Sequence, residues 1–187
     1  MATEFIQRVL NETRGQERSV SWFRKKIREF GGNPRSISLD LVREGKRSRT
    51  LFLGRLNMFF YSPKYKDKLP YYDRFPLVLP LEKYREGFMG INMHYLPIPL
   101  RTRLLDKLYE FSNNDKFDST TRLTATYNRM RNIPLVKPTL HKYLYDFVET
   151  SFRRIDVDEF IVAALLPVQR FEKATDRKVW RDSRGMI

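Results

Sequence analysis

The chain has 187 residues, of which 36 are Lys or Arg and 22 are Asp or Glu, and its formal net charge is +14. A positive charge of this size favours a polyanionic partner or a strongly acidic protein neighbour. The apolar residues, 41% of the chain, can form a core, which excludes wholesale disorder. With no cysteine and two histidines, the chain excludes disulfide scaffolds, thiolate metal sites and multi-histidine metal sites. It shows no secretion signal or bilayer-spanning apolar run, so we expect a soluble protein.

The first 55 residues predict two helices followed by a basic connector. Apolar residues between positions 20 and 30 recur three or four residues apart, which is the spacing of one helix face. The run Gly31–Pro34 then ends that helix. Residues 33–55 have little apolar periodicity and contain a short basic run, which is typical of an arm that orders on a partner.

Residues 55–97 predict a small antiparallel β-sheet or barrel. Leu77–Leu79 is an apolar strand between two prolines, which restrict it to a sheet edge or to short pieces. From Met89 to Tyr95 the apolar residues alternate with others, a pattern that indicates a half-buried strand. The segment between these strands, 82–87, is the predicted hairpin turn.

The C-terminal half returns to helical spacing. Apolar stripes predict helices at 100–111, 123–130 and 140–148, and a short helix around 160–166. The tail from Phe171 onward is predicted to be loosely ordered. The fold class is therefore α+β, with N-terminal helices and a basic arm, the small sheet or barrel, and a C-terminal helical layer. We expect segments 1–55 and 56–187 to form one compact domain.

Catalytic motifs are missing from the sequence. It contains no phosphate-binding glycine loop and no GxSxG nucleophile elbow. Glu44-Gly45-Lys46, with Asp40 before it, has the spacing of a nuclease metal site. No apolar strand surrounds it, so a solvated connector is the favoured interpretation. We therefore predict no enzyme activity and no cofactor or metal site.

Three titratable residues have structural interpretations that compete with catalytic ones. Asp73 is interpreted as a turn cap or as the partner of Arg74 or a nearby lysine rather than as a metal ligand. His94 is interpreted as a hydrogen-bonded sheet histidine. His141 is placed near a helix N-terminus, where the positive potential disfavours a general base.

Clusters of basic residues are the candidate nucleic-acid contacts, because cations release counterions when they meet phosphates. The tyrosines near one cluster, Tyr65, Tyr71 and Tyr72, either stack on bases or pack the loop. A solvated basic surface, or docking onto acidic proteins, is the alternative. The predicted DNA-binding residues are Arg24, Lys25, Lys26, Arg28, Lys46, Arg47, Arg49, Lys64, Lys66, Lys68, Arg153 and Arg154. A further cluster in the tail consists of Arg177, Lys178, Arg181 and Arg184.

The surplus of positive charge is uneven along the chain. Residues 1–55 hold 13 basic and 6 acidic groups, a net +7, and residues 122–187 hold 13 and 8, a net +5. Residues 56–121 hold 10 and 8, a net +2. If DNA is bound, the flanks and the arm at 46–49 are predicted to bind it, and the centre is predicted to be scaffold or protein interface.

The centre of the chain resembles a family of virion proteins from T-even-like myoviruses, labelled DNA end protector. The strings that carry the resemblance are Gly54–Tyr61, Lys68–Leu77 and Gly87–Pro97, and weaker matches continue to Ser183. The resemblance supplies no catalytic residues. It implies a structural protein of a contractile-tailed phage that binds and shields the packaged end of linear double-stranded DNA without reading its sequence.

The alternative is an assembly component of the tail tube, neck or baseplate hub that has protein partners only. Either function places the protein in the virion, and in the host cytoplasm during assembly. The predicted partners are linear phage DNA and other head–tail or tail proteins. No membrane or small-molecule substrate is predicted.

Overall fold

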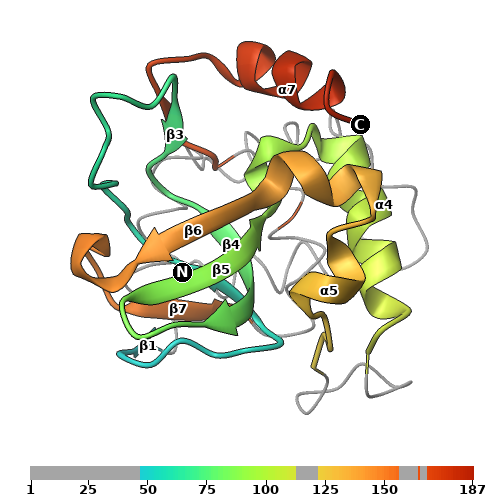
Figure 1. The fold of residues 1–187 in the computed structure, drawn as a ribbon, viewed down its shortest axis with the longest axis horizontal. Coiled ribbons are helices and arrows are strands. Elements are labelled where there is room, and N and C mark those ends of the chain that lie inside the picture. Colours follow the sequence, from blue (N-terminus) through green and yellow to red (C-terminus); the bar gives the residue numbers. More distant parts are fainter. Residues whose placement is uncertain (1–46, 113–121, 156–163, 165–167) are drawn as a thin grey trace, which may run out of the picture.

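The computed structural model describes residues 47–112, 122–155, 164 and 168–187 (Figure 1). The helices predicted in the first 46 residues lie outside this part of the chain, as does most of the helix predicted around 160–166. In the described residues no helix is long and apolar enough to cross a membrane.

A six-stranded antiparallel sheet forms the centre of the fold, in the order β1-β7-β2-β4-β5-β6. Its strands are β1 (Arg47–Ser48), β2 (Leu56–Met58), β4 (Leu77–Lys83), β5 (Gly87–Asn92), β6 (Leu140–Leu144) and β7 (Phe152–Ile155). A separate antiparallel pair consists of β3 (Tyr72–Asp73) and β8 (Phe171–Glu172). The helices are η1 (Met93–Tyr95), α4 (Ile98–Tyr109), α5 (Tyr127–Met130), η2 (Pro134–Thr139), η3 (Tyr145–Phe147) and α7 (Asp176–Arg184). The α+β class is confirmed, and the sheet is open rather than closed into a barrel.

The two faces of the sheet bury different kinds of side chain. On one face, aliphatic residues of β2, β4 and β5 pack with Leu104, Leu105 and Leu108 of α4. On the other face, Phe59 lies at the centre of an aromatic cluster, with four rings at centroid distances of 5.2 to 6.2 Å. Burial of both faces from water supplies the main stabilisation of the fold.

Strand β4 lies inside the sheet between β2 and β5, so of the two predicted alternatives, an edge strand or short pieces, the edge strand is wrong. A register shift between Pro80 and Glu82 admits the proline, which has no N–H to give to the ladder. Gly90 lies opposite Pro80, and a Cβ atom on Gly90 would collide with the Val78 side chain. The missing side chain of Gly90 is what lets the chains approach at this bulge.

Strand β5 is also more deeply buried than the alternation of apolar and other residues in its sequence indicates. All its residues except Met89 are buried, so the prediction of a half-buried strand is wrong. The reason is that both faces of the sheet are covered at this point, which alternation alone does not reveal. The strand ends at Asn92, and the predicted strand residues Met93–Tyr95 form the helical turn η1.

The C-terminal half contains three strands, β6, β7 and β8, none of which was predicted as a strand. The helix predicted at 100–111 is confirmed as α4, and only one turn of the helix at 123–130 forms, as α5. The helix predicted at 140–148 is wrong, because β6 pairs with β5 and places Tyr143 in the aromatic cluster. The loose tail is wrong too, since β8 and α7 are ordered and Val179 is fully buried.

Candidate nucleic-acid interface

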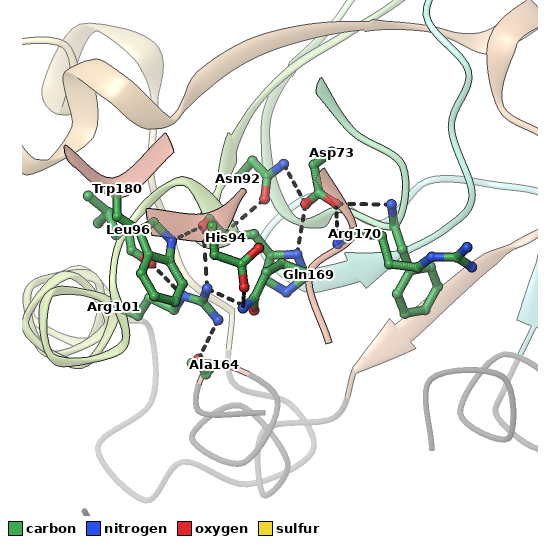
Figure 2. Close-up of polar contacts among 11 residues, drawn as sticks. Asp73, Asn92, His94, Leu96, Arg101, Ala164, Gln169, Arg170 and Trp180 are labelled. Carbon is green, nitrogen blue, oxygen red and sulfur yellow. Dashed lines mark hydrogen bonds and ion pairs between the residues drawn. The ribbon is translucent and has the colours of Figure 1, made fainter. Parts of the chain in front are cut away.

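A buried carboxylate organises the side of the molecule where α7 meets the sheet. Asp73 of β3 is 3% exposed and accepts bonds from the backbone N–H groups of Phe75 and Arg170, at 3.0 and 3.2 Å. Its second oxygen lies 2.7 Å from Nδ1 of His94 and 3.2 Å from Nδ2 of Asn92 (Figure 2). The structural interpretation of Asp73 is confirmed, but the predicted partner is wrong: Arg74 pairs instead with Glu149 at 2.8 Å.

The protonation states of Asp73 and His94 follow from their burial and from their contacts. Burial alone would raise the pKa of Asp73, but the contact with His94 and the backbone N–H bonds outweigh it and hold that pKa below its usual value. Burial lowers the pKa of His94 more than the carboxylate raises it. At neutral pH the pair is therefore a carboxylate that accepts a bond from Nδ1–H of a neutral histidine.

Arg101 of α4 extends this network towards the C-terminal segment. Its buried guanidinium donates to the carbonyl oxygens of Leu96, His94 and Ala164 at 2.7, 3.3 and 3.2 Å (Figure 2). It also donates to Oε1 of Gln169 at 3.0 Å. Burial lowers the pKa of Arg101 to about 10, so it remains a cation at neutral pH. Each of the three guanidinium nitrogens thus has an acceptor, which is what a buried cation requires.

The same network fixes α7 on the protein. The indole Nε1 of Trp180 donates to the His94 carbonyl oxygen at 3.0 Å, and the Gln169 amide donates to Asp176 at 2.7 Å. The Thr175 side chain caps the helix by accepting from Lys178 N. These contacts fix the helix that carries the basic residues of the tail. No sequence pattern indicated these contacts, because the bonded residues are up to 86 positions apart.

Loop 62–70, between β2 and β3, is held by a lysine that the sequence analysis did not single out. The ammonium of Lys173 donates to the carbonyl oxygens of Lys66, Asp67 and Leu69. Lys173 has a φ of 66°, which is rare for a residue with a side chain. Nothing in its local sequence, between Glu172 and Ala174, indicates this role.

The cations of loop 62–70 face water. Lys64, Lys66 and Lys68 are all exposed, and the Tyr65 ring between them is 58% exposed. The ammonium groups of Lys64 and Lys68 lie 5.5 and 5.9 Å from the centre of that ring. The loop therefore presents three cations, two of them beside one aromatic ring, together with the carboxylate of Asp67.

Helix α7 contacts Tyr71, which follows this loop, and adds its own cations. Arg177, Lys178, Arg181 and Arg184 are exposed along it. The Lys178 ammonium pairs with Asp182 at 2.8 Å and lies 5.9 Å from the centre of the Tyr71 ring. We call the exposed cations of loop 62–70 and of α7 the loop–α7 surface. The structure thus joins two basic clusters that are more than 100 residues apart.

The other predicted DNA-binding residues lie elsewhere. Arg49 is exposed beside a second cavity of about 470 Å³, which Lys83 also lines. Arg47 pairs with Arg153 across β1 and β7. Arg153 is 4% exposed, and Arg154 is half-buried with its guanidinium 5.6 Å from the Phe52 ring centre. Five of the predicted DNA-binding residues lie outside the described part of the chain: Arg24, Lys25, Lys26, Arg28 and Lys46.

A metal centre has no support in the described residues, where no group of three or more His, Asp or Glu side chains could hold an ion. The nuclease-like Asp40 and Glu44 lie outside those residues. The interpretation of His94 as a hydrogen-bonded histidine is confirmed, although its backbone is in η1. His141 lies in strand β6, so its predicted place at a helix N-terminus is wrong.

An open α+β fold with exposed cations around an exposed tyrosine defines a class of basic proteins suited to polyanions. Comparison with family models identifies the particular class: residues 4–183 match the model described as Phage T4 terminal DNA protecting protein. The chain belongs to this family, which confirms the resemblance to DNA end protectors. Neither the curated proteins nor the solved structures gave a match.

Membership of this family makes the chain a phage DNA-end protecting protein, and phage DNA ends are the expected partner. Such a protein is expected in the virion or in the infected host cytoplasm. The family is one of structural DNA-protecting proteins rather than a class of enzymes.

Proposed function

We propose that this chain binds the end of linear double-stranded phage DNA through its phosphates, without reading the sequence, and shields that end within the particle. The observation that carries the proposal is the loop–α7 surface, whose cations are exposed while the scaffold cation Arg101 is buried and bonded. Contacts to phosphate position a protein on DNA and carry no sequence information directly. The proposed protein has no catalytic step, and its protection is steric.

The experiment compares linear duplex DNA with a dumbbell of the same sequence whose two ends are closed by hairpin loops. We expect the linear duplex to bind more tightly, its ends to resist an exonuclease, and its affinity to fall steeply as salt rises. Equal affinity for two unrelated sequences is expected as well. Equal affinity for linear and closed DNA would contradict end binding, and no binding at low salt would contradict any DNA-binding role.

The same materials test the remaining parts of the proposal. Location in intact particles distinguishes a protein at the packaged DNA end from a tail tube, neck or baseplate component. We expect the protein to be absent from DNA-free tails. Fixed stoichiometry with head–tail or tail proteins in such tails would instead support the assembly role. Incubation of supercoiled DNA with the protein and Mg²⁺ is expected to leave the DNA uncut.

A further inference from the structure

A cavity of about 420 Å³ lies next to the loop–α7 surface. Four segments that are distant in sequence form its wall: residues 61–73 with loop 62–70, Tyr95 of η1, residues 137–143 around β6, and Ser183 and Met186 at and just after the end of α7. The volume is within the usual range for sites that hold a small organic group. The cavity is therefore large enough for one part of a larger ligand, such as a single nucleotide.

Aromatic rings form much of the wall. The Tyr95 ring lies 4.0 Å from the His141 ring, centre to centre, and 6.1 Å from Tyr71. The Tyr61 and Tyr143 rings lie 5.0 Å apart, at 72°. The six aromatic residues that line the cavity are Tyr61, Tyr71, Tyr72, Tyr95, His141 and Tyr143. The faces of such rings are surfaces on which nucleic-acid bases stack without regard to sequence.

The charges at the cavity favour an anionic ligand. Lys137 lines it and is exposed, and it makes no ion pair with any residue in the described part of the chain. Lys142 also lines it and is paired with Glu86 at 2.7 Å. The carboxylate of Asp73 belongs to the wall, but both its oxygens already accept bonds from buried donors. The Asp73 charge is therefore buried and hydrogen-bonded, and the exposed Lys137 is the charge that a ligand at the rim would meet.

We propose that this cavity receives the terminal nucleotide of the DNA end, with its base against the tyrosine rings and its phosphate near Lys137. This inference rests on the proposed function and adds to it a specific site for the end. An aromatic wall suits a base, a cationic rim suits a phosphate, and loop 62–70 joins the cavity to the cations that contact the adjoining phosphates. A terminal base has one stacking neighbour, so unpairing it costs less than flipping an internal base.

Tyr72 is the side chain best suited to a test. It is half-buried, lines the cavity and is placed by the pairing of β3 with β8, so removal of its ring keeps the backbone bonds. Tyr72→Leu keeps an apolar side chain and removes the aromatic face. Leu69→Trp is a second variant, because Leu69 lines the cavity and is 36% exposed, so the larger ring can fill the space. Tyr84→Leu is the matched control, since Tyr84 is 40% exposed and does not line the cavity.

The experiment uses the full chain and a short duplex with one open end and one hairpin-closed end. The adenine analogue 2-aminopurine is placed at the terminal or at an internal position. We expect binding to change the fluorescence of the terminal analogue and to leave the internal one unchanged. Tyr72→Leu and Leu69→Trp should each lower the open-end affinity on the order of tenfold. Their affinity for the dumbbell, and both affinities of Tyr84→Leu, should equal those of the wild type.

The outcomes separate this inference from the proposed function. If linear DNA is preferred over the dumbbell but the terminal analogue does not respond, the cavity does not hold the nucleotide. The same conclusion follows if both cavity variants bind the open end as the wild type does, or if they weaken open-end and dumbbell binding equally. If linear DNA and the dumbbell bind equally, the proposed end-binding function fails, and the cavity site fails with it.

Discussion

The buried network around Asp73 and the exposed loop 62–70 are two charged regions that use charge in opposite ways. In the network, the Asp73 carboxylate and the Arg101 guanidinium are buried, and each is hydrogen-bonded to other groups of the protein. In the loop, Lys64, Lys66 and Lys68 face water. Charge in the first region is committed to the fold, and charge in the second is open to a polyanion. Net charge along the sequence does not separate these uses.

The largest expected effect comes from breaking the buried network. Asp73→Ala leaves two backbone N–H groups, Asn92 and His94 without their acceptor. A buried donor left without an acceptor costs about 1–3 kcal/mol, so the four losses together, partly relieved by relaxation, are expected to cost about 3–5 kcal/mol. We expect the free energy of unfolding to fall by this amount, measured by urea denaturation at neutral pH.

Asp73→Asn is the control for that prediction. Its amide oxygen can keep the two backbone bonds that Oδ1 accepts, so we expect roughly half the loss in unfolding free energy. The DNA affinity of either variant, measured where it is folded, should keep the wild-type salt dependence. A change in that dependence would show that the network also contributes to DNA binding.

The next effect concerns the exposed loop. Substitution of Lys64, Lys66 and Lys68 by Gln should lower affinity for linear duplex DNA on the order of 100-fold at physiological salt. It should reduce the slope of log affinity against log salt by about 2 to 3, because each phosphate contact contributes about 0.9. The free energy of unfolding should change by less than about 0.5 kcal/mol, as at most exposed sites.

The matched control removes the same charge elsewhere. Arg103, Lys107 and Arg131 are exposed on or next to α4 and α5, across the molecule from loop 62–70 (Figure 1). Their joint substitution by Gln should change the salt slope by less than half as much. Equal losses from the two triple variants would mean that net charge, and not the loop–α7 surface, governs binding.

A smaller effect depends on pH and comes from His141, which lines the cavity next to the two regions. Burial lowers the pKa of His141 to about 4 from 6.5, so the unfolded chain takes up this proton first. Stability should therefore fall as the pH drops below 6.5, and this contribution should level off near pH 4. His141→Asn should reduce the loss between pH 7 and pH 5.5 by about 1 kcal/mol, measured by urea denaturation. An unchanged pH profile would contradict this placement of His141.

Sequence patterns predicted the features that depend on neighbouring residues. The α+β class, helix α4 and the hairpin of β4 and β5 follow from local spacing and turn chemistry. Strand β6 could not be predicted in this way. Its apolar spacing also fits a helix, and its conformation is decided by pairing with β5, about 50 residues away.

The candidate site shows the same limit. Exposed lysines at 64–68 were predicted from composition, and they do lie at the surface. Arg153, chosen on the same grounds, is buried in β7 at 4% exposure. The contact of loop 62–70 with Lys173 joins residues more than 100 positions apart, and no local pattern marks it. Tertiary contacts decide which cation is scaffold and which is free.

Lys173 is the residue in which the two uses of charge meet, because its ammonium holds the loop that presents the other cations. Residue 173 has a φ of 66°, which is strained for any residue with a side chain. Lys173→Met therefore leaves the backbone strain as it is in the wild type and removes only the ammonium group. Since Lys173 is exposed, we expect a loss of unfolding free energy of only about 0.5–1 kcal/mol.

The clearest readout for this variant is hydrogen exchange. The amides of Lys66, Lys68 and Leu69 bond within the loop, so they should exchange faster in Lys173→Met while those of β4 and β5 do not. Affinity for the open DNA end should fall severalfold with little change in salt slope, because the loop cations remain but are no longer preorganised. Unchanged exchange in the loop would mean that its own turns are enough to hold the three lysines in place.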